Sequence, residues 1–95
     1  MKRVEIIANR SVEQDTLHAL EDACGELPYT LIPDVSGRGR QGHRRGDAVW
    51  PELNVYLLIF CDDAQAAEIV RAMGTLKERF PREGIKVYVS AVECG

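Results

Sequence analysis

The residues best suited to bind a charged ligand lie between positions 36 and 53. This stretch has glycines at positions 37, 39, 42 and 46, and its basic residues are Arg38, Arg40, Arg44 and Arg45. Glycine lets the backbone approach an anion closely and present its N–H groups. An arginine guanidinium adds a fork of donors that matches phosphate or carboxylate oxygens. The composition therefore predicts an anion-binding loop, and the alternative is a solvated loop whose arginines serve solubility.

Apolar runs on both sides of the loop predict the elements that position it. Strands are expected at residues 4–8, 29–35, 55–61 and 85–92, because these runs are short, apolar and rich in β-branched residues. The run at 55–61 is almost continuously apolar, which is typical of a central strand. Pro33 predicts that the second strand lies at an edge or contains a bulge.

Two helices are predicted between these strands. Ser11 stands three residues before Gln14, and Asp62 stands three residues before Gln65, so both pairs match a capping box. Apolar residues at helical spacing follow each pair. Gly25 suits the end of the first helix, and Pro81 stops the second.

The order strand–helix–strand, long loop, strand–helix–strand predicts one α+β domain over residues 1–95. We expect a ferredoxin-like βαββαβ fold, a four-stranded antiparallel sheet with both helices on one face. The other face is expected to carry apolar side chains such as those of Val4, Leu58 and Val89. A partner subunit is the simplest cover for such a face.

Composition narrows the class of function. The formal charge of −3 argues against a general nucleic-acid binder. The start of the chain lacks the features of a secretory signal, and no run approaches the roughly 18 apolar residues that span a bilayer, so a cytoplasmic protein is expected. No nucleophile–base pair or acid–base pair stands at a telling spacing, so we do not expect an enzyme.

Cysteine and histidine residues offer a second chemistry. A soft-metal site could combine some of Cys24, Cys61, Cys94, His18 and His43. The favoured interpretation makes Cys24 and Cys61 small core residues, His18 a residue of the helix surface, and Cys94 an accessible thiol.

Trp50 lies between the arginines and Pro51. It could stack on a base, but we expect it to anchor the base of the loop against the sheet.

The run Gly37-Arg38-Gly39-Arg40-Gln41-Gly42-His43 resembles the start of the T-loop of PII signal-transduction proteins, and Arg45-Gly46 resembles a later pair in that loop. The likeness covers nearly the whole chain. Met1-Lys2-Arg3 precedes a similar first strand, Asp62-Asp63 opens the second helix, and Gly84 and Lys86 lie near the position of the family's B-loop.

The resemblance implies a homotrimer with an adenine nucleotide (ADP, AMP or ATP) in each cleft between subunits. Gly37, Arg38, Gly39 and Arg40 would line the phosphates, and Gln41 would reach a phosphate-bound metal, for which Mg²⁺ is the candidate, or a second small ligand. Ile7 and Ile59 would flank the adenine. Arg82, Gly84 and Lys86 would approach from the B-loop side.

Departures from the family pattern indicate a divergent branch with a short T-loop. The lysine associated with 2-oxoglutarate is replaced within Glu52-Leu53-Asn54. The resemblance implies a regulator that senses the nucleotide, and with it a small anion, and signals through residues 36–53 to a partner such as a membrane transporter. The alternative is a metal- or anion-responsive trimer of the related CutA type, which needs no glycine–arginine loop.

Overall fold

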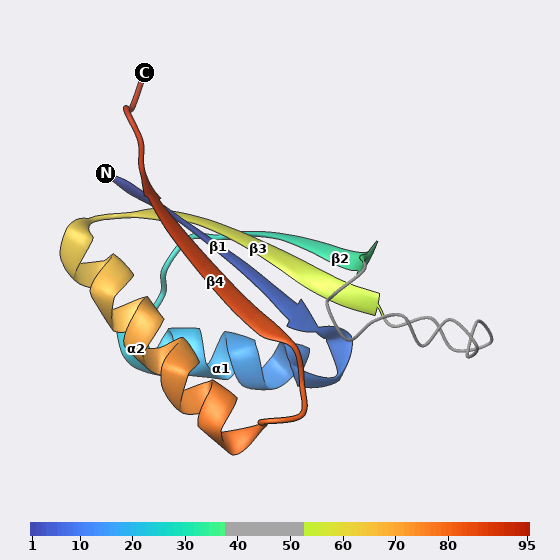
Figure 1. The fold of residues 1–95 in the computed structure, drawn as a ribbon. Helices are drawn as coiled ribbons and strands as arrows, with labels where there is room; N and C mark the ends of the chain where they lie inside the picture. Colours follow the sequence, from blue (N-terminus) through green and yellow to red (C-terminus); the bar gives the residue numbers. More distant parts are fainter. Residues whose placement is uncertain (38–52) are drawn as a thin grey trace.

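Four strands and two α-helices make up the fold in a computed structural model, which describes residues 1–37 and 53–95 (Figure 1). In chain order they are β1 (Lys2–Asn9), a 3₁₀ turn (Arg10–Val12), α1 (Glu13–Cys24), β2 (Thr30–Ser36), β3 (Leu53–Cys61), α2 (Asp63–Arg79) and β4 (Ile85–Ala91).

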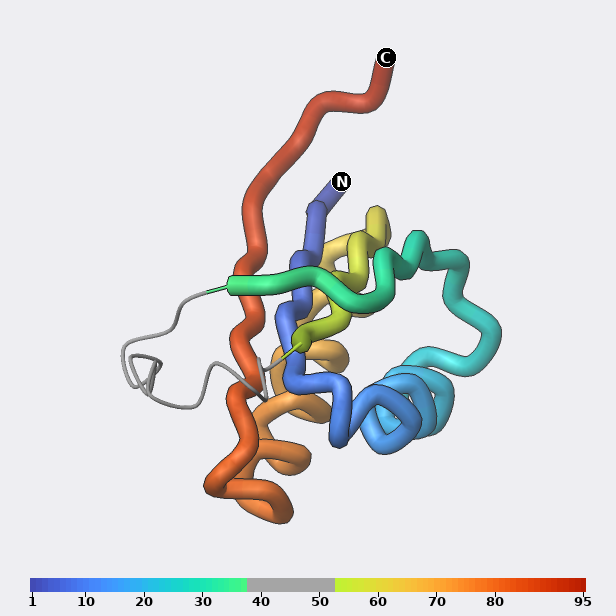
Figure 2. Tube along the Cα trace, turned by 90° about the vertical axis from the view of Figure 1, so that its right-hand side faces the viewer, coloured from blue at the N-terminus to red at the C-terminus, as the bar shows by residue number. Residues whose placement is uncertain are grey.

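The strands form a single antiparallel sheet in the order β2-β3-β1-β4. Both helices lie on the same side of this sheet, as Figures 1 and 2 show. The predicted ferredoxin-like α+β fold is therefore confirmed. None of the helices in the described ranges is both long and apolar enough to cross a membrane.

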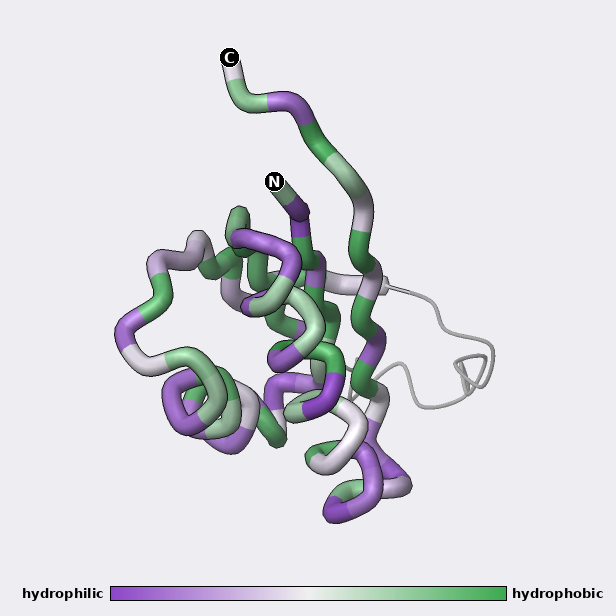
Figure 3. The backbone as a smooth tube through the Cα atoms, turned by 90° about the vertical axis from the view of Figure 1, so that its left-hand side faces the viewer, coloured by the Kyte–Doolittle hydropathy of each residue, from purple (hydrophilic) through white to green (hydrophobic). Residues whose placement is uncertain are grey.

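The core lies between the sheet and the helices. Alternate residues of β1 point into it, so that Val4, Ile6 and Ala8 are fully buried. The apolar stripe of α2 closes the core from the other side with Ile69 and Met73, which are also buried. Figure 3 shows the corresponding division, with hydrophilic segments on the outward turns of the helices.

The two predicted helix starts differ in outcome. Asp62 forms the predicted capping box, because its carboxylate accepts from the Gln65 N–H (2.7 Å) while the Gln65 side chain accepts from the Asp62 N–H (3.0 Å). The capping box predicted at Ser11 is wrong. Asn9 caps this end instead, since its side-chain oxygen accepts from the Ser11 N–H (2.9 Å) and starts the 3₁₀ turn that precedes α1.

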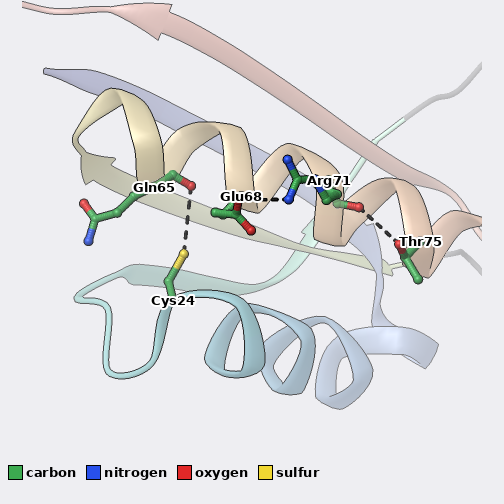
Figure 4. Close-up of polar contacts among 5 residues, drawn as sticks. All are labelled: Cys24, Gln65, Glu68, Arg71 and Thr75. Carbon is green, nitrogen blue, oxygen red and sulfur yellow. Dashed lines mark hydrogen bonds and ion pairs between the residues drawn. The ribbon is translucent and has the colours of Figure 1, made fainter.

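The end of α1 contacts the first turn of α2 (Figure 4). There the Cys24 thiol lies 3.9 Å from the Gln65 carbonyl oxygen. Cys61 is buried, Cys24 half-buried and Cys94 exposed, as predicted, and His18 is exposed on α1. Burial raises the pKa of both the Cys24 and the Cys61 thiols, so these two cysteines favour the unreactive protonated form.

The second face of the sheet carries different residues from those predicted. Val4 pairs with Ile59 and Val89, so all three lie on the helix side, and the prediction for Val4 and Val89 is wrong. Leu58 does lie on the second face. We call this side the open face and define it by the side chains of Arg3, Glu5, Ile7, Ile32, Tyr56, Leu58, Phe60, Lys86, Tyr88 and Ser90.

Candidate functional site

The base of the arginine loop is fixed by strand pairing. Ser36, the last residue of β2, pairs with Leu53, the first residue of β3. Gly37 follows directly, and a Cβ at this glycine would stand 3.6 Å from the Asn54 amide nitrogen, so the backbone here lies beside β3. Both ends of the loop therefore leave the same end of the sheet.

Most of the predicted phosphate-binding residues lie outside the described residues. These are Arg38, Gly39, Arg40 and Gln41, and the same holds for His43 and Trp50. Their roles stay predictions.

A bulge in β2 shapes the strand just before the loop. The pairing of β2 with β3 shifts between Ile32 and Val35, and β2 is an edge strand, so Pro33 marks both features predicted from it. Asp34, inside the bulge, has a positive φ of 55°. Its carboxylate accepts from the Arg10 guanidinium at 3.1 Å, which ties the bulge to the chain just after β1.

The turn before β4 is attached to the same end of β1. The Asn9 N–H donates to the Gly84 carbonyl oxygen at 2.9 Å. The Ser11 hydroxyl donates to the Glu83 carboxylate, also at 2.9 Å. Arg82 and Gly84 are exposed in this turn. Sequence reasoning missed these ties, and the only signal in the chain was the polar cluster that follows the first apolar run.

Two of the predicted site residues lie together on the open face. Ile7 pairs with Lys86, so their side chains stand next to each other near the Gly84 turn. Gly37 lies at the same end of the sheet but follows β2, and β3 and β1 separate it from β4. With neighbouring strands about 4.8 Å apart, Gly37 and Lys86 are at least about 14 Å apart within one subunit.

Ile59 is not brought together with Ile7. Ile59 is 1% exposed and lies on the helix side, opposite Val4, whereas Ile7 lies on the open face, opposite Tyr56. Ile59 borders a hollow between the end of α1 and residues 25–29 instead. A ligand on the open face would therefore contact the Ile7 side chain but not the side chain of Ile59.

A small polar network interrupts the open face. The Tyr56 hydroxyl donates to the Glu5 carboxylate across the β1–β3 pair. This hydrogen bond to a carboxylate, together with partial desolvation, raises the pKa of Tyr56. The Arg3 Nε lies 3.6 Å from the other Glu5 oxygen. Within residues 1–37 and 53–95, no three His, Cys, Asp or Glu side chains gather as they would around a metal ion.

Comparison with known proteins identifies the family. The family model described as Nitrogen regulatory protein P-II matches residues 1–94. The chain belongs to this family. It is a divergent PII-like protein, and no curated protein sequence matches it.

Solved structures of PII-like proteins share the fold. CPII from Thiomonas intermedia K12, bound to ADP, AMP and bicarbonate, is 17% identical, with a TM-score of 0.75 over 99% of this chain and 91% of that one. CPII bound to ADP, AMP and acetate is also 17% identical, with a TM-score of 0.73 over 99% of this chain and 87% of that one. A putative PII-like signalling protein from Thermus thermophilus is 27% identical, with a TM-score of 0.65 over 94% of this chain and 83% of that one.

Proposed function

We propose that this P-II chain is a cytoplasmic regulator, and not an enzyme, that binds an adenine nucleotide together with a small anion. The nucleotide is ADP, AMP or ATP, bound in the cleft between subunits of a homotrimer. Binding sets the conformation of residues 36–53, and this loop then contacts a protein partner such as a membrane transporter. No nucleic acid is involved.

The observation that carries this proposal is the arrangement at one end of the sheet. The paired residues Ser36 and Leu53 hold the loop base there, and the bond from Asn9 to Gly84 holds the turn before β4 there. Lys86 supplies a cation next to an apolar surface at Ile7, which suits a ligand with a charged end and a flat apolar end.

The distance across the sheet favours a site built from two subunits. Gly37 and Lys86 stand at least about 14 Å apart in one chain, too far for one phosphate group to contact both. When the loop base of one subunit faces Lys86 of its neighbour, both can contact one nucleotide. Gly37, Arg38, Gly39 and Arg40 would then hold the phosphates against Arg82, Gly84 and Lys86, with Ile7 against the adenine.

The second ligand follows from what the similar structures contain. CPII holds ADP and AMP together with bicarbonate in one structure and with acetate in another. Both anions are small carboxylate-like groups, which a guanidinium fork and backbone N–H groups can bind. Gln41 is proposed to reach this anion or a phosphate-bound Mg²⁺.

Calorimetry with ATP, ADP and AMP tests the proposal on the wild type and on Arg40→Ala and Lys86→Ala. Losing a charged hydrogen bond worth roughly 1.5–3 kcal/mol should weaken binding by about tenfold to a hundredfold. Arg71→Ala, which removes an exposed α2 cation paired with Glu68, is the control and should leave affinity unchanged.

Two results would count against the proposal. Failure of all three nucleotides to bind the wild type below about millimolar concentration would refute nucleotide sensing. Normal binding to both Arg40→Ala and Lys86→Ala would show that the nucleotide lies elsewhere. The alternative of a metal-responsive trimer is tested by adding divalent metals in the same titrations.

A further inference from the structure

The open face contains an ion pair that is only partly satisfied within one chain. Arg3 and Glu5 lie two residues apart on β1 and point to the same side. The Arg3 Nε is 3.6 Å from the Glu5 carboxylate, too far for a hydrogen bond. Among the described residues, this buried Nε and the neighbouring buried Ser90 hydroxyl have no hydrogen-bond partner.

Such groups are costly unless another molecule completes them. A buried donor without a partner has lost its hydrogen bonds to water without replacing them, and the cost is larger when the donor is charged. Glu5, by contrast, is held in place by the hydrogen bond from Tyr56. The open face thus presents a fixed carboxylate next to a guanidinium whose Nε donor is unused.

Apolar side chains surround this polar pair on the open face. Phe60 and Tyr88 are 51% and 53% exposed, and Ile32 on the edge strand is 47% exposed. Phe60 pairs with Arg3, and Tyr88 pairs with Glu5, so each charged side chain has an exposed ring beside it. A partner that covered this face with apolar groups alone would bury both charges without completing their hydrogen bonds, which is strongly unfavourable.

We propose that, where the subunits of the homotrimer meet on the open face, Arg3 of one copy donates to Glu5 of the next. This proposal rests on the homotrimer of the proposed function and identifies the contact that sets its register. The Cα atoms of these two oppositely charged residues stand about 7 Å apart along one strand, so the surface is complementary to itself. In a ring of identical subunits the same contact repeats at every interface.

The contact between Arg3 and Glu5 of neighbouring copies would mainly determine how the copies align, rather than how tightly they bind. A neighbour shifted along the strand would place Arg3 against Arg3, or Glu5 against Glu5, in a partly desolvated interface. Like charges in such a position strongly disfavour that alignment. The apolar side chains supply the attraction, and the charged pair selects one alignment.

Charge reversal tests this contact by size-exclusion chromatography with light scattering over a dilution series. Glu5→Arg and Arg3→Glu should each raise the concentration at which the assembly dissociates by at least about tenfold, since each places like charges together. The double variant Arg3→Glu/Glu5→Arg should recover most of the loss, because it restores opposite charges. Arg71→Glu, which disrupts the exposed pair on α2, is the control and should assemble as the wild type does.

Circular dichroism confirms that each variant is folded. Should a reversal unfold the chain, Glu5→Gln replaces it, since the amide still accepts from Tyr56 and only the charge is lost; this variant should also dissociate at higher concentration. Single reversals that assemble like the wild type, or a double variant no better than the singles, would overturn the inference. A wild type that is monomeric would instead refute the homotrimer itself, whether or not nucleotides bind.

Discussion

Tyr56 and Glu5 show how a single hydrogen bond on the open face responds to pH. The phenol must keep its proton to donate to the carboxylate, and for this reason the pKa of Tyr56 is raised above its ordinary value of 10.0. The folded protein therefore holds this proton more tightly than the unfolded chain does. The resulting stabilisation is complete below pH 10 and is lost as the pH rises through the folded-state pKa.

We accordingly expect Tyr56→Phe to weaken the dependence of the free energy of unfolding on pH in the alkaline range. Below pH 9 or so the variant should be less stable than the wild type by about 1 kcal/mol, the net worth of one hydrogen bond. The difference should shrink above pH 10 or so, as the wild type loses the proton. Urea unfolding between pH 7 and 11 measures this. Tyr29→Phe, at an exposed position on the linker before β2, is the control. A difference in the free energy of unfolding between Tyr56→Phe and the wild type that stayed constant at all pH values would contradict the argument.

Among the elements, α2 owes its start to the capping box at Asp62. Asp62→Ala removes the acceptor for the Gln65 N–H and should lower the free energy of unfolding by about 0.5–2 kcal/mol. Asp63→Ala is the matched control, since Asp63 contributes through the helix dipole alone, which is worth about 0.3–1 kcal/mol. Thermal unfolding at neutral pH compares the two, and an equal loss in both would show that the cap hydrogen bond is not the source of stability.

Sequence patterns predicted these elements where the local signal was unambiguous. Alternation and the Asp62–Gln65 spacing located α2 and the strands within one or two residues. The capping-box prediction at Ser11 failed because Asn9, two residues earlier, has the same capping chemistry and lies where the strand ends. The spacing of Ser11 and Gln14 cannot tell which of two nearby polar residues caps the turn.

It was harder to predict which face of the sheet each strand residue occupies. The alternation between the two faces cannot be read from the sequence where adjacent residues are both apolar. Ile6 and Ile7 are both apolar, yet one lies in the core and the other on the open face. The continuous run of β3 likewise gave no means of placing Ile59 on the helix side. The Arg10–Asp34 and Asn9–Gly84 contacts join residues far apart in the chain, so only the folded sheet brings them together.

At the scale of the whole molecule, the core and the arginine loop occupy separate parts of the chain. The described core residues run from Val4 to Ile85 and lie on both sides of the loop. Replacing residues 38–52 by a glycine–serine linker of the same length should therefore leave the free energy of unfolding within about 1 kcal/mol, because the closure entropy depends mainly on loop length. Nucleotide affinity, measured by calorimetry, should fall by at least about tenfold.

A linker variant that fails to fold would show that the loop contributes to the core after all. Full nucleotide affinity in the folded variant would place the phosphates away from the loop. The same linker carrying only Arg38 and Arg40 at their native positions should regain part of the affinity, which separates their role from that of the remaining loop residues.

Because Ser36 pairs with Leu53, the loop between them can be replaced without changing the sheet. Paired residues on antiparallel strands have Cα atoms about 4.5–5.5 Å apart, so any insert needs only to return to its starting point. Doubling its length would cost only about 0.6 kcal/mol in closure entropy. New partners could thus be acquired by grafting a different loop onto an unchanged scaffold, and a designer could use this hairpin to display foreign peptides.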